Sequence, residues 1–222
     1  MQYFTHEYLE FFKELAANNH KEWFDTNRKR YEEIVREPFK TFVADLIKAV
    51  HKQSPEVEIE AKDAIFRINR DIRFSKDKTP YKLNNSAIIS KTGRKDRSYP
   101  GLYIELGPEH LGIFGGIYTA DNNQIKKIRS EILNHADKFT EIISANDFVE
   151  KFGKIKGEQH KRVPQAFKEA VELQPLIMNK QWYHNVLLPS ELIIGDDLME
   201  TILDHNKTAL PLKNFLINAL NR

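Results

Sequence analysis

The spacing of apolar residues changes twice along this chain of 222 residues, and the change limits the folds open to it. Near the N-terminus apolar residues recur at helical intervals, as at Tyr8, Phe11, Phe12 and Leu15. Between Gly101 and Tyr118 they alternate instead, as in antiparallel strands, and helical spacing resumes at Ile125. Helices, then strands, then helices indicate the α+β class.

The same pattern gives the expected layout. We predict a single α+β domain over residues 1–222, with a mostly antiparallel sheet and N-terminal and C-terminal helices packed around it. The helical N-terminal part covers about 1–53, the central sheet about 60–120 and the helical C-terminal part about 121–222. Strands are expected near 64–68, 86–90, 101–106, 111–118 and 182–188.

Two helix starts carry capping-box signals. Asn19 is followed three residues later by Glu22, and Asp121 is followed three residues later by Gln124. In a capping box the first side chain accepts a backbone N–H of the first turn, and the second side chain returns the bond. We therefore predict that one helix begins after Asn19 and another after Asp121.

Several kinds of chemistry find no support in the sequence. There is no cysteine, which excludes disulfides and thiolate chemistry, and none of the eight histidines has another at i+3 or i+4. Signatures of nucleotide-binding loops and serine hydrolases are missing. We therefore predict no metal and no cofactor, and we assign no catalytic residue.

The N-terminus has no signal-peptide pattern, and no apolar run approaches the roughly 18–20 residues that a membrane span needs. We therefore expect a cytoplasmic protein with no membrane partner. The oligomeric state is not readable from the sequence.

The charge is concentrated in one segment. The formal net charge is only +2, but ten basic residues and three aspartates lie between Arg67 and Arg97. Such a basic segment can attract anions, and it can also be a solvated face.

The densest part of this segment is RINRDIRFSKDKTPYK, residues 67–82. Arginine suits bidentate capture of phosphate or carboxylate, and lysine provides a mobile point charge. If the segment is extended, Arg70 falls among apolar residues and needs a carboxylate or a bound anion. The candidate anion-binding residues are Arg67, Arg70, Asp71, Arg73, Lys76, Asp77, Lys78, Tyr81 and Lys82.

This run resembles the hallmark of the domain of unknown function 2461. Other stretches are similar to the same family: Phe11–Leu15, Asn18–Phe24, Gly101-Leu102-Tyr103, Gly115-Gly116, a following helix with Arg129, and Lys161–Pro164. Tyr118 departs from the family pattern, which more often has tryptophan there. The resemblance implies one α+β domain in a soluble bacterial protein, and it implies no particular activity.

The resemblance also draws attention to secondary candidates: Trp23, Tyr103, Glu105, Gly115, Gly116 and Arg129. Tyr103 and Glu105 share one strand face, where they can serve acid–base chemistry or a cross-strand contact. Two adjacent glycines in a strand mark a bulge, a close backbone approach or a ligand contact. Arg129 is expected opposite the apolar stripe of its helix, within reach of the sheet or of water.

Three functions compete. The protein binds, with or without turnover, an anionic or phosphorylated small ligand; or the basic motif is an ion-pair scaffold in a structural or interaction domain; or it is a nucleic-acid-binding module. We favour the first, and whether the protein is an enzyme stays open. If each cation of the motif has a carboxylate partner, the first hypothesis loses its basis.

Overall fold

The computed structural model describes residues 1–222 and divides into two compact units. The first contains Met1–Lys95, Tyr103–Ile113 and Leu187–Leu203, and the second contains Asp96–Leu102, Phe114–Val186 and Asp204–Arg222. Whether the two units fold together as the single domain expected from the sequence stays a prediction.

The α+β class is confirmed. An antiparallel sheet has the order β1 (Asn85–Ile89), β2 (Leu102–Leu106), β3 (Leu111–Ile117) and β4 (Trp182–Leu188). A tight turn joins β2 to β3, in which the amide of Gly107 donates to the carbonyl of His110 over 3.2 Å. The strands predicted near 86–90, 101–106, 111–118 and 182–188 are therefore confirmed.

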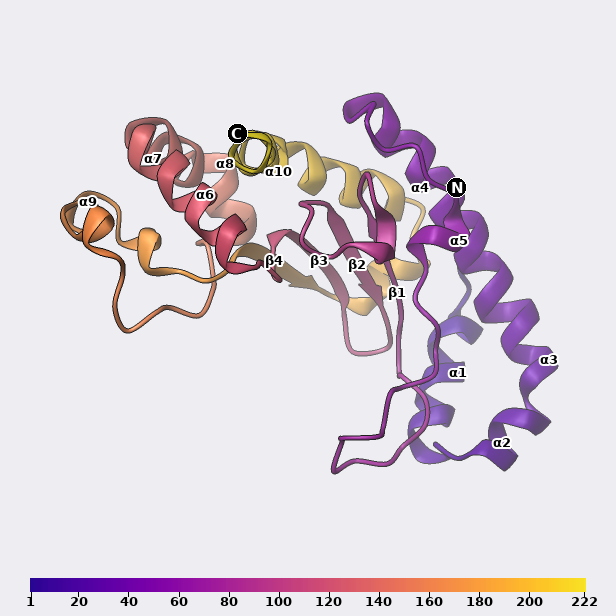
Figure 1. Ribbon diagram of the computed structural model, residues 1–222. Helices are drawn as coiled ribbons and strands as arrows, with labels where there is room; N and C mark the ends of the chain where they lie inside the picture. The colour runs from indigo at the N-terminus through magenta and orange to yellow at the C-terminus, as the bar shows by residue number, and fades with distance from the viewer. The chain divides into compact units, whose positions relative to one another are not determined.

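Helices make up most of the N-terminal region of the first unit (Figure 1). They are α1 (His6–Ala17), α2 (Lys21–Thr26), α3 (Arg28–Arg30), the π-helical segment η1 (Tyr31–Arg36), α4 (Glu37–Gln53) and α5 (Ala61–Ala64). Short 3-10 turns follow at Gly93–Lys95 and Ser190–Ile194. Aromatic side chains fill the core of this unit: Tyr8, Phe11, Phe12 and Phe42 have no exposed surface.

The predicted strand at 64–68 is wrong. Residues 61–64 form α5, and the chain beyond it makes only isolated bridges, Ile65 with Ala87 and Asn69 with Tyr81. Pro80 has no N–H to donate, so regular strand pairing stops there. The Pro80 carbonyl still accepts the Arg70 amide. We call residues 65–70 and 80–87 the arm, and residues 71–79 between them the motif loop.

One of the two capping boxes is confirmed. Asp121 and Gln124 make both reciprocal bonds at the start of a helix. The box at Asn19 is wrong, because His20 is the N-cap of α2 and its ring accepts the Trp23 amide. Asn19 instead bonds both the N–H and the C=O of Tyr81, at 3.1 and 3.0 Å, and so ties α2 to the arm.

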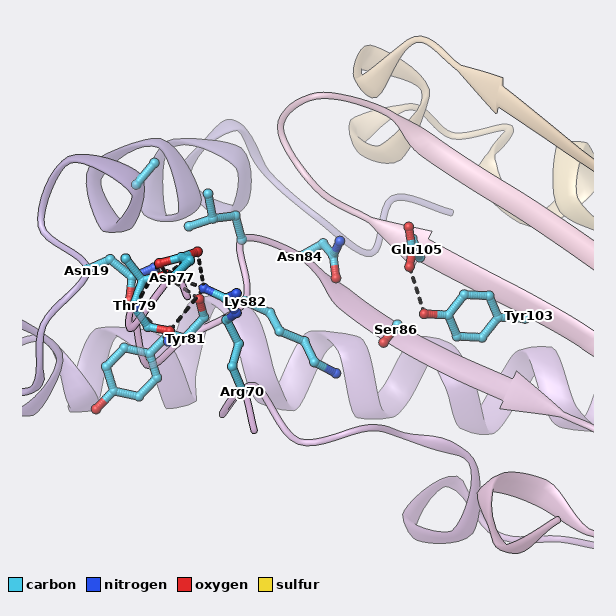
Figure 2. Close-up of a pocket in the computed structure, with 12 residues that line it drawn as sticks. Asn19, Arg70, Asp77, Thr79, Tyr81, Lys82, Asn84, Ser86, Tyr103 and Glu105 are labelled. Atoms are coloured by element: carbon cyan, nitrogen blue, oxygen red, sulfur yellow. Dashed lines mark hydrogen bonds and ion pairs between the residues drawn. The ribbon is translucent and has the colours of Figure 1, made fainter. Parts of the chain in front are cut away.

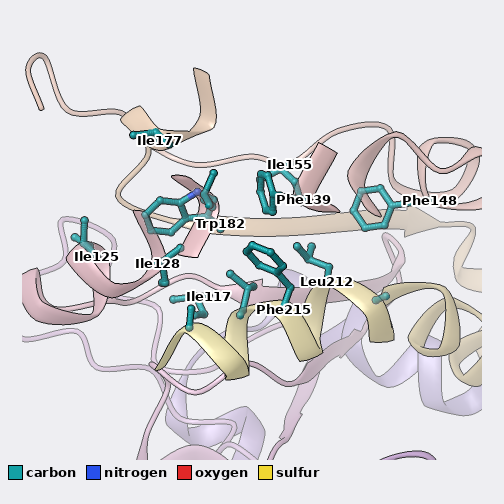
Figure 3. Close-up of a cluster of buried hydrophobic side chains, with 14 of the residues drawn as sticks. Ile117, Ile125, Ile128, Phe139, Phe148, Ile155, Ile177, Trp182, Leu212 and Phe215 are labelled. Carbon is teal, nitrogen blue, oxygen red and sulfur yellow. The ribbon is translucent and has the colours of Figure 1, made fainter. Parts of the chain in front are cut away.

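The second unit contains α6 (Asn122–Asn134), α7 (Ala136–Ser144), α8 (Asn146–Phe152), α9 (Lys168–Leu173), 3-10 turns at Gln165–Phe167 and Pro175–Met178, and the larger part of α10 (Leu198–Asn221). Figure 3 shows its core, where Trp182 of β4 lies near Ile128, and Phe139 lies near Phe215. None of the helices combines the length and apolar composition that crossing a membrane requires.

Candidate functional site

Several predicted residues from separate segments gather round one cavity in the first unit (Figure 2). Its volume is about 510 Å³. We call it the polar cavity, and its lining includes Asn19, Arg70, Asp77, Thr79, Tyr81, Lys82, Asn84, Ser86, Tyr103 and Glu105. Residues of the basic motif and the Tyr–Glu pair of β2 therefore line the same cavity.

Arg70 closes the motif loop. Its Nη1 donates to Oδ2 of Asp77 at 2.5 Å, to the carbonyl of Thr79 at 3.1 Å and to the Thr79 hydroxyl. The backbone amide of Thr79 donates to Asp77, as does the Arg70 guanidinium, and these bonds lower the pKa of the Asp77 carboxyl to about 2. Arg70 thus has the carboxylate that its place in the sequence required.

Arg73 has a carboxylate partner as well. Its Nε and Nη2 donate to the two oxygens of Asp71 at 3.0 and 2.8 Å, and this pairing lowers the pKa of Asp71 to about 2. Both groups lie at the surface, with 77% and 48% of their side chains exposed. Two of the three arginines of the motif are therefore neutralised within the motif loop.

The remaining motif residues Lys76, Lys78 and Tyr81 form no ion pair with the aspartates of the motif loop. Lys78 donates to the carbonyl of Ile72 at 2.9 Å, and Lys76 is exposed. Tyr81 is buried, and its ring stacks on Phe24 with the ring centroids 4.1 Å apart. One face of the Tyr81 ring is thus covered by the core.

Lys82 lies where the arm meets the polar cavity. Its Nζ is 5.3 Å from the centroid of the Phe66 ring, within the range of a cation–π contact. The Phe66 ring also meets Tyr103 edge-on, with their centroids 6.0 Å apart. Phe66 therefore touches two residues that line the polar cavity.

The Tyr–Glu pair of β2 is hydrogen-bonded. The Tyr103 hydroxyl donates to Oε1 of Glu105 at 2.7 Å, and Nε2 of His110 lies 3.6 Å from the other oxygen. Alternate residues of β2 are buried, so Tyr103 and Glu105 share the opposite face as predicted. Such a pair can exchange a proton with a bound molecule, and it also stabilises its strand.

Arg67 does not reach the polar cavity. It lines a second cavity of the first unit, of about 470 Å³, which we call the cationic cavity. The cations of this lining are Arg28, Arg36, Lys40, Lys62, Arg67 and Arg94, and Glu32 is its single acidic residue.

Most of these cations also have carboxylate partners nearby. The pairs are Arg28–Asp25, Arg36–Glu32, Lys40–Glu37 and Lys62–Glu60, with closest distances of 2.5, 2.7, 3.4 and 2.7 Å. Arg67 influences Asp71 only through space, and Arg94 donates to the carbonyl of Lys62 at 3.3 Å. Two guanidinium groups without an ion pair therefore line one cavity.

The remaining secondary candidates lie elsewhere. Trp23 is half-buried against Phe11 in the first unit. Arg129, for which the sheet and water were both open, is 4% exposed in the second unit, where it donates to backbone carbonyls that include those of Ile177 and Asn179. Burial lowers the pKa of its guanidinium.

The glycine pair marks a close approach within the second unit. A methyl group at Gly115 would lie 2.5 Å from Cε1 of His184. One at Gly116, whose φ is +92°, would overlap the carbonyl oxygen of Trp182. These contacts give both glycines a packing role.

The sequence did not single out five of the six cations of the cationic cavity. Four of them belong to helical segments, and each has an acidic residue two to four positions away. In the sequence such a cation is typical of an ordinary surface ion pair. Arg94 did lie within the basic segment, but its distance of 27 positions from Arg67 hid their convergence. No three His, Asp or Glu side chains come together in a way that could hold a metal ion.

The fold and the two cavities define an α+β protein whose basic arm lines both cavities of one unit. The chain belongs to the family described as "Conserved hypothetical protein (DUF2461)", whose profile matches residues 7–215. This match confirms the resemblance seen in the motif. No curated protein matches the chain.

Proposed function

We propose that this protein binds a small anionic ligand, and that the cationic cavity is the binding site. The observation that carries the proposal is that Arg67 and Arg94 line the same cavity without an ion pair. Two planar guanidinium groups suit the oxygens of a phosphate or carboxylate, each by a charge-assisted pair of bonds.

The four paired cations of this cavity support the same function. Asp25, Glu37 and Glu60 are exposed carboxylates and Glu32 is half-buried, and surface pairs of this kind contribute about 0–1 kcal/mol each. A bound anion can therefore share these cations at little cost. A single acidic residue, Glu32, lines the cavity against six cations, so its field favours negative charge.

The motif loop supports a different role for its own residues. Arg70 and Arg73 each have a carboxylate partner, which favours the ion-pair scaffold for this part of the motif. In this proposal the loop fixes the arm, and the arm presents Arg67 to the ligand. The hydrogen-bonded Tyr103–Glu105 pair lines the polar cavity, and it is our candidate for acid–base chemistry on a small molecule.

Thermal unfolding in the presence of inorganic phosphate, sugar phosphates, dicarboxylates and short oligonucleotides tests the proposal at fixed ionic strength. We expect a rise in melting temperature with small anions, and loss of that rise in the Arg67→Ala/Arg94→Ala variant. Arg73→Ala is the matched control, because it removes the same side chain from the same segment but outside the cavity. An equal loss in the control, or no rise with any anion, would contradict the proposal.

A preference for oligonucleotides with a steep dependence on salt would favour the nucleic-acid module instead.

A further inference from the structure

The inner surface of the cationic cavity is apolar. Phe24, Tyr31, Phe39 and Ile68 line it and are buried, while all six cations are exposed, so the cations form a rim above an apolar floor. The Arg28 guanidinium lies 5.6 Å from the centroid of the Phe24 ring, which places part of this rim over the floor. Sites for organic ligands are cavities of roughly 300–1,000 Å³ that combine apolar surface with polar groups, and this cavity combines the two with an unusually large share of cations.

The helix wall of the cavity is irregular. Tyr31, Glu32 and Arg36 all line the cavity, and all belong to the π-helical segment η1. π-helical turns are rare and occur frequently at functional sites. Burial raises the pKa of Tyr31 to about 12, so its hydroxyl remains protonated at neutral pH and is available as a donor.

The charge of the rim distinguishes between anions. Two unpaired arginines and four exchangeable cations match a dianion better than a single negative charge. A phosphate monoester carries about −1.5 to −2 charges at pH 7 and has three acceptor oxygens. A monocarboxylate has one charge and two oxygens, and would leave part of the rim unmatched.

We propose that the ligand is an organic phosphate monoester with a flat body. Its phosphate binds Arg67 and Arg94, its body covers the apolar floor, and a neutral oxygen of that body accepts from the Tyr31 hydroxyl. This inference rests on the proposed function and narrows the anion to one class.

Isothermal titration calorimetry with nucleoside monophosphates, phenyl phosphate, inorganic phosphate and unphosphorylated nucleosides tests it. The nucleoside monophosphates combine a phosphate, a flat ring and oxygen acceptors, while each of the other probes lacks at least one of these. We expect at least one nucleoside monophosphate to bind about tenfold or more tighter than inorganic phosphate, and the nucleosides not to bind.

A variant of the donor separates the body of the ligand from its phosphate. Tyr31→Phe retains the ring, and it should weaken binding of the nucleoside monophosphate about tenfold, the value of a lost hydrogen bond, and leave inorganic phosphate unaffected. Lys52→Ala, an exposed cation outside the cavity lining, is the control.

Two failures are distinguishable. If inorganic phosphate binds as tightly as every ester, or if the preference for an ester survives Tyr31→Phe unchanged, the organic-phosphate inference is wrong while anion binding stands. If no probe binds, or if binding survives Arg67→Ala/Arg94→Ala, the proposed function is wrong as well.

Discussion

Arg70 shows, at the scale of single residues, what the ion pairs of the motif loop contribute to stability. Its side chain is 28% exposed and that of its partner Asp77 is 58% exposed. A pair this open to water contributes about 1 kcal/mol or less. Arg70→Ala should therefore lower the free energy of unfolding by about 1 kcal/mol, as measured by urea denaturation.

Arg73→Ala provides the comparison, because its pair with Asp71 is more exposed and should contribute less. A loss above about 3 kcal/mol in Arg70→Ala would mean that a buried charge has lost its partner. The motif loop would then be a scaffold on which the whole fold depends.

Asp77 gives the motif loop a pH dependence. Its pKa of about 2 lies below the ordinary value of about 4, first because the Thr79 amide donates to it and second because Arg70 does. Since the folded-state pKa is the lower one, the stabilisation is complete above about pH 4 and is lost as the pH falls towards 2.

Carboxyl NMR titration should therefore give Asp77 a midpoint near 2. In Arg70→Ala the midpoint should rise but stay below the ordinary value, because the Thr79 amide remains. A midpoint near 4 in the wild type would show that the motif loop is open in solution.

These residues also show how far sequence reasoning extends. The need of Arg70 for a carboxylate follows from its position among apolar neighbours, and Asp77 is only seven residues away. The unpaired state of Arg67 follows from no local pattern. The grouping of Arg67 with other cations follows from none either, because it depends on where α4, α5 and the 3-10 turn at Gly93–Lys95 place Lys40, Lys62 and Arg94.

At the scale of elements, Gly116 sets the distance between two strands. Its φ of +92° is costly for other residues, and an added methyl group would overlap the Trp182 carbonyl and lie 2.9 Å from the Tyr183 Cα. Backbone atoms of β4 cannot move aside without breaking the sheet. Gly116→Ala should therefore lower the free energy of unfolding by more than about 2 kcal/mol, as measured by urea denaturation.

Gly153→Ala is the matched control for this prediction. Its φ is +71°, but no atom lies within 4 Å of the added methyl group. It should cost only the conformational strain, roughly 1–3 kcal/mol, and less than Gly116→Ala. Equal losses at both sites would mean that strain, and not the close approach, makes Gly116 necessary.

Elements were predictable where local pattern and long-range partners agree. Alternation predicted β2 and β3, and Asp121 caps its helix through reciprocal bonds with Gln124, only three residues away. Asn19 carried the same signal, but Tyr81, 62 residues away, uses its amide. The π-helical segment could not be predicted, because the apolar spacing through Tyr31, Val35 and Phe39 also fits a regular helix.

At the scale of the whole molecule, the division into two units raises the question of cooperativity. β2, β3, β4 and α10 each contribute residues to both units, so neither unit is a continuous piece of chain. Local unfolding of one unit would break strands and a helix that the other unit shares. We therefore predict one unfolding transition for the whole chain, as expected of a single domain.

The two tryptophans allow a direct test, because Trp23 belongs to the first unit and Trp182 to the second. Trp23→Phe leaves Trp182 as the only reporter, and Trp182→Phe leaves Trp23. Trp182→Phe also removes a hydrogen bond to the Leu176 carbonyl, so its midpoint should be the lower of the two. Within each variant, fluorescence and circular dichroism should give the same urea midpoint. Non-coincident curves in either variant would show that the units unfold separately, and the single-domain prediction would then be wrong.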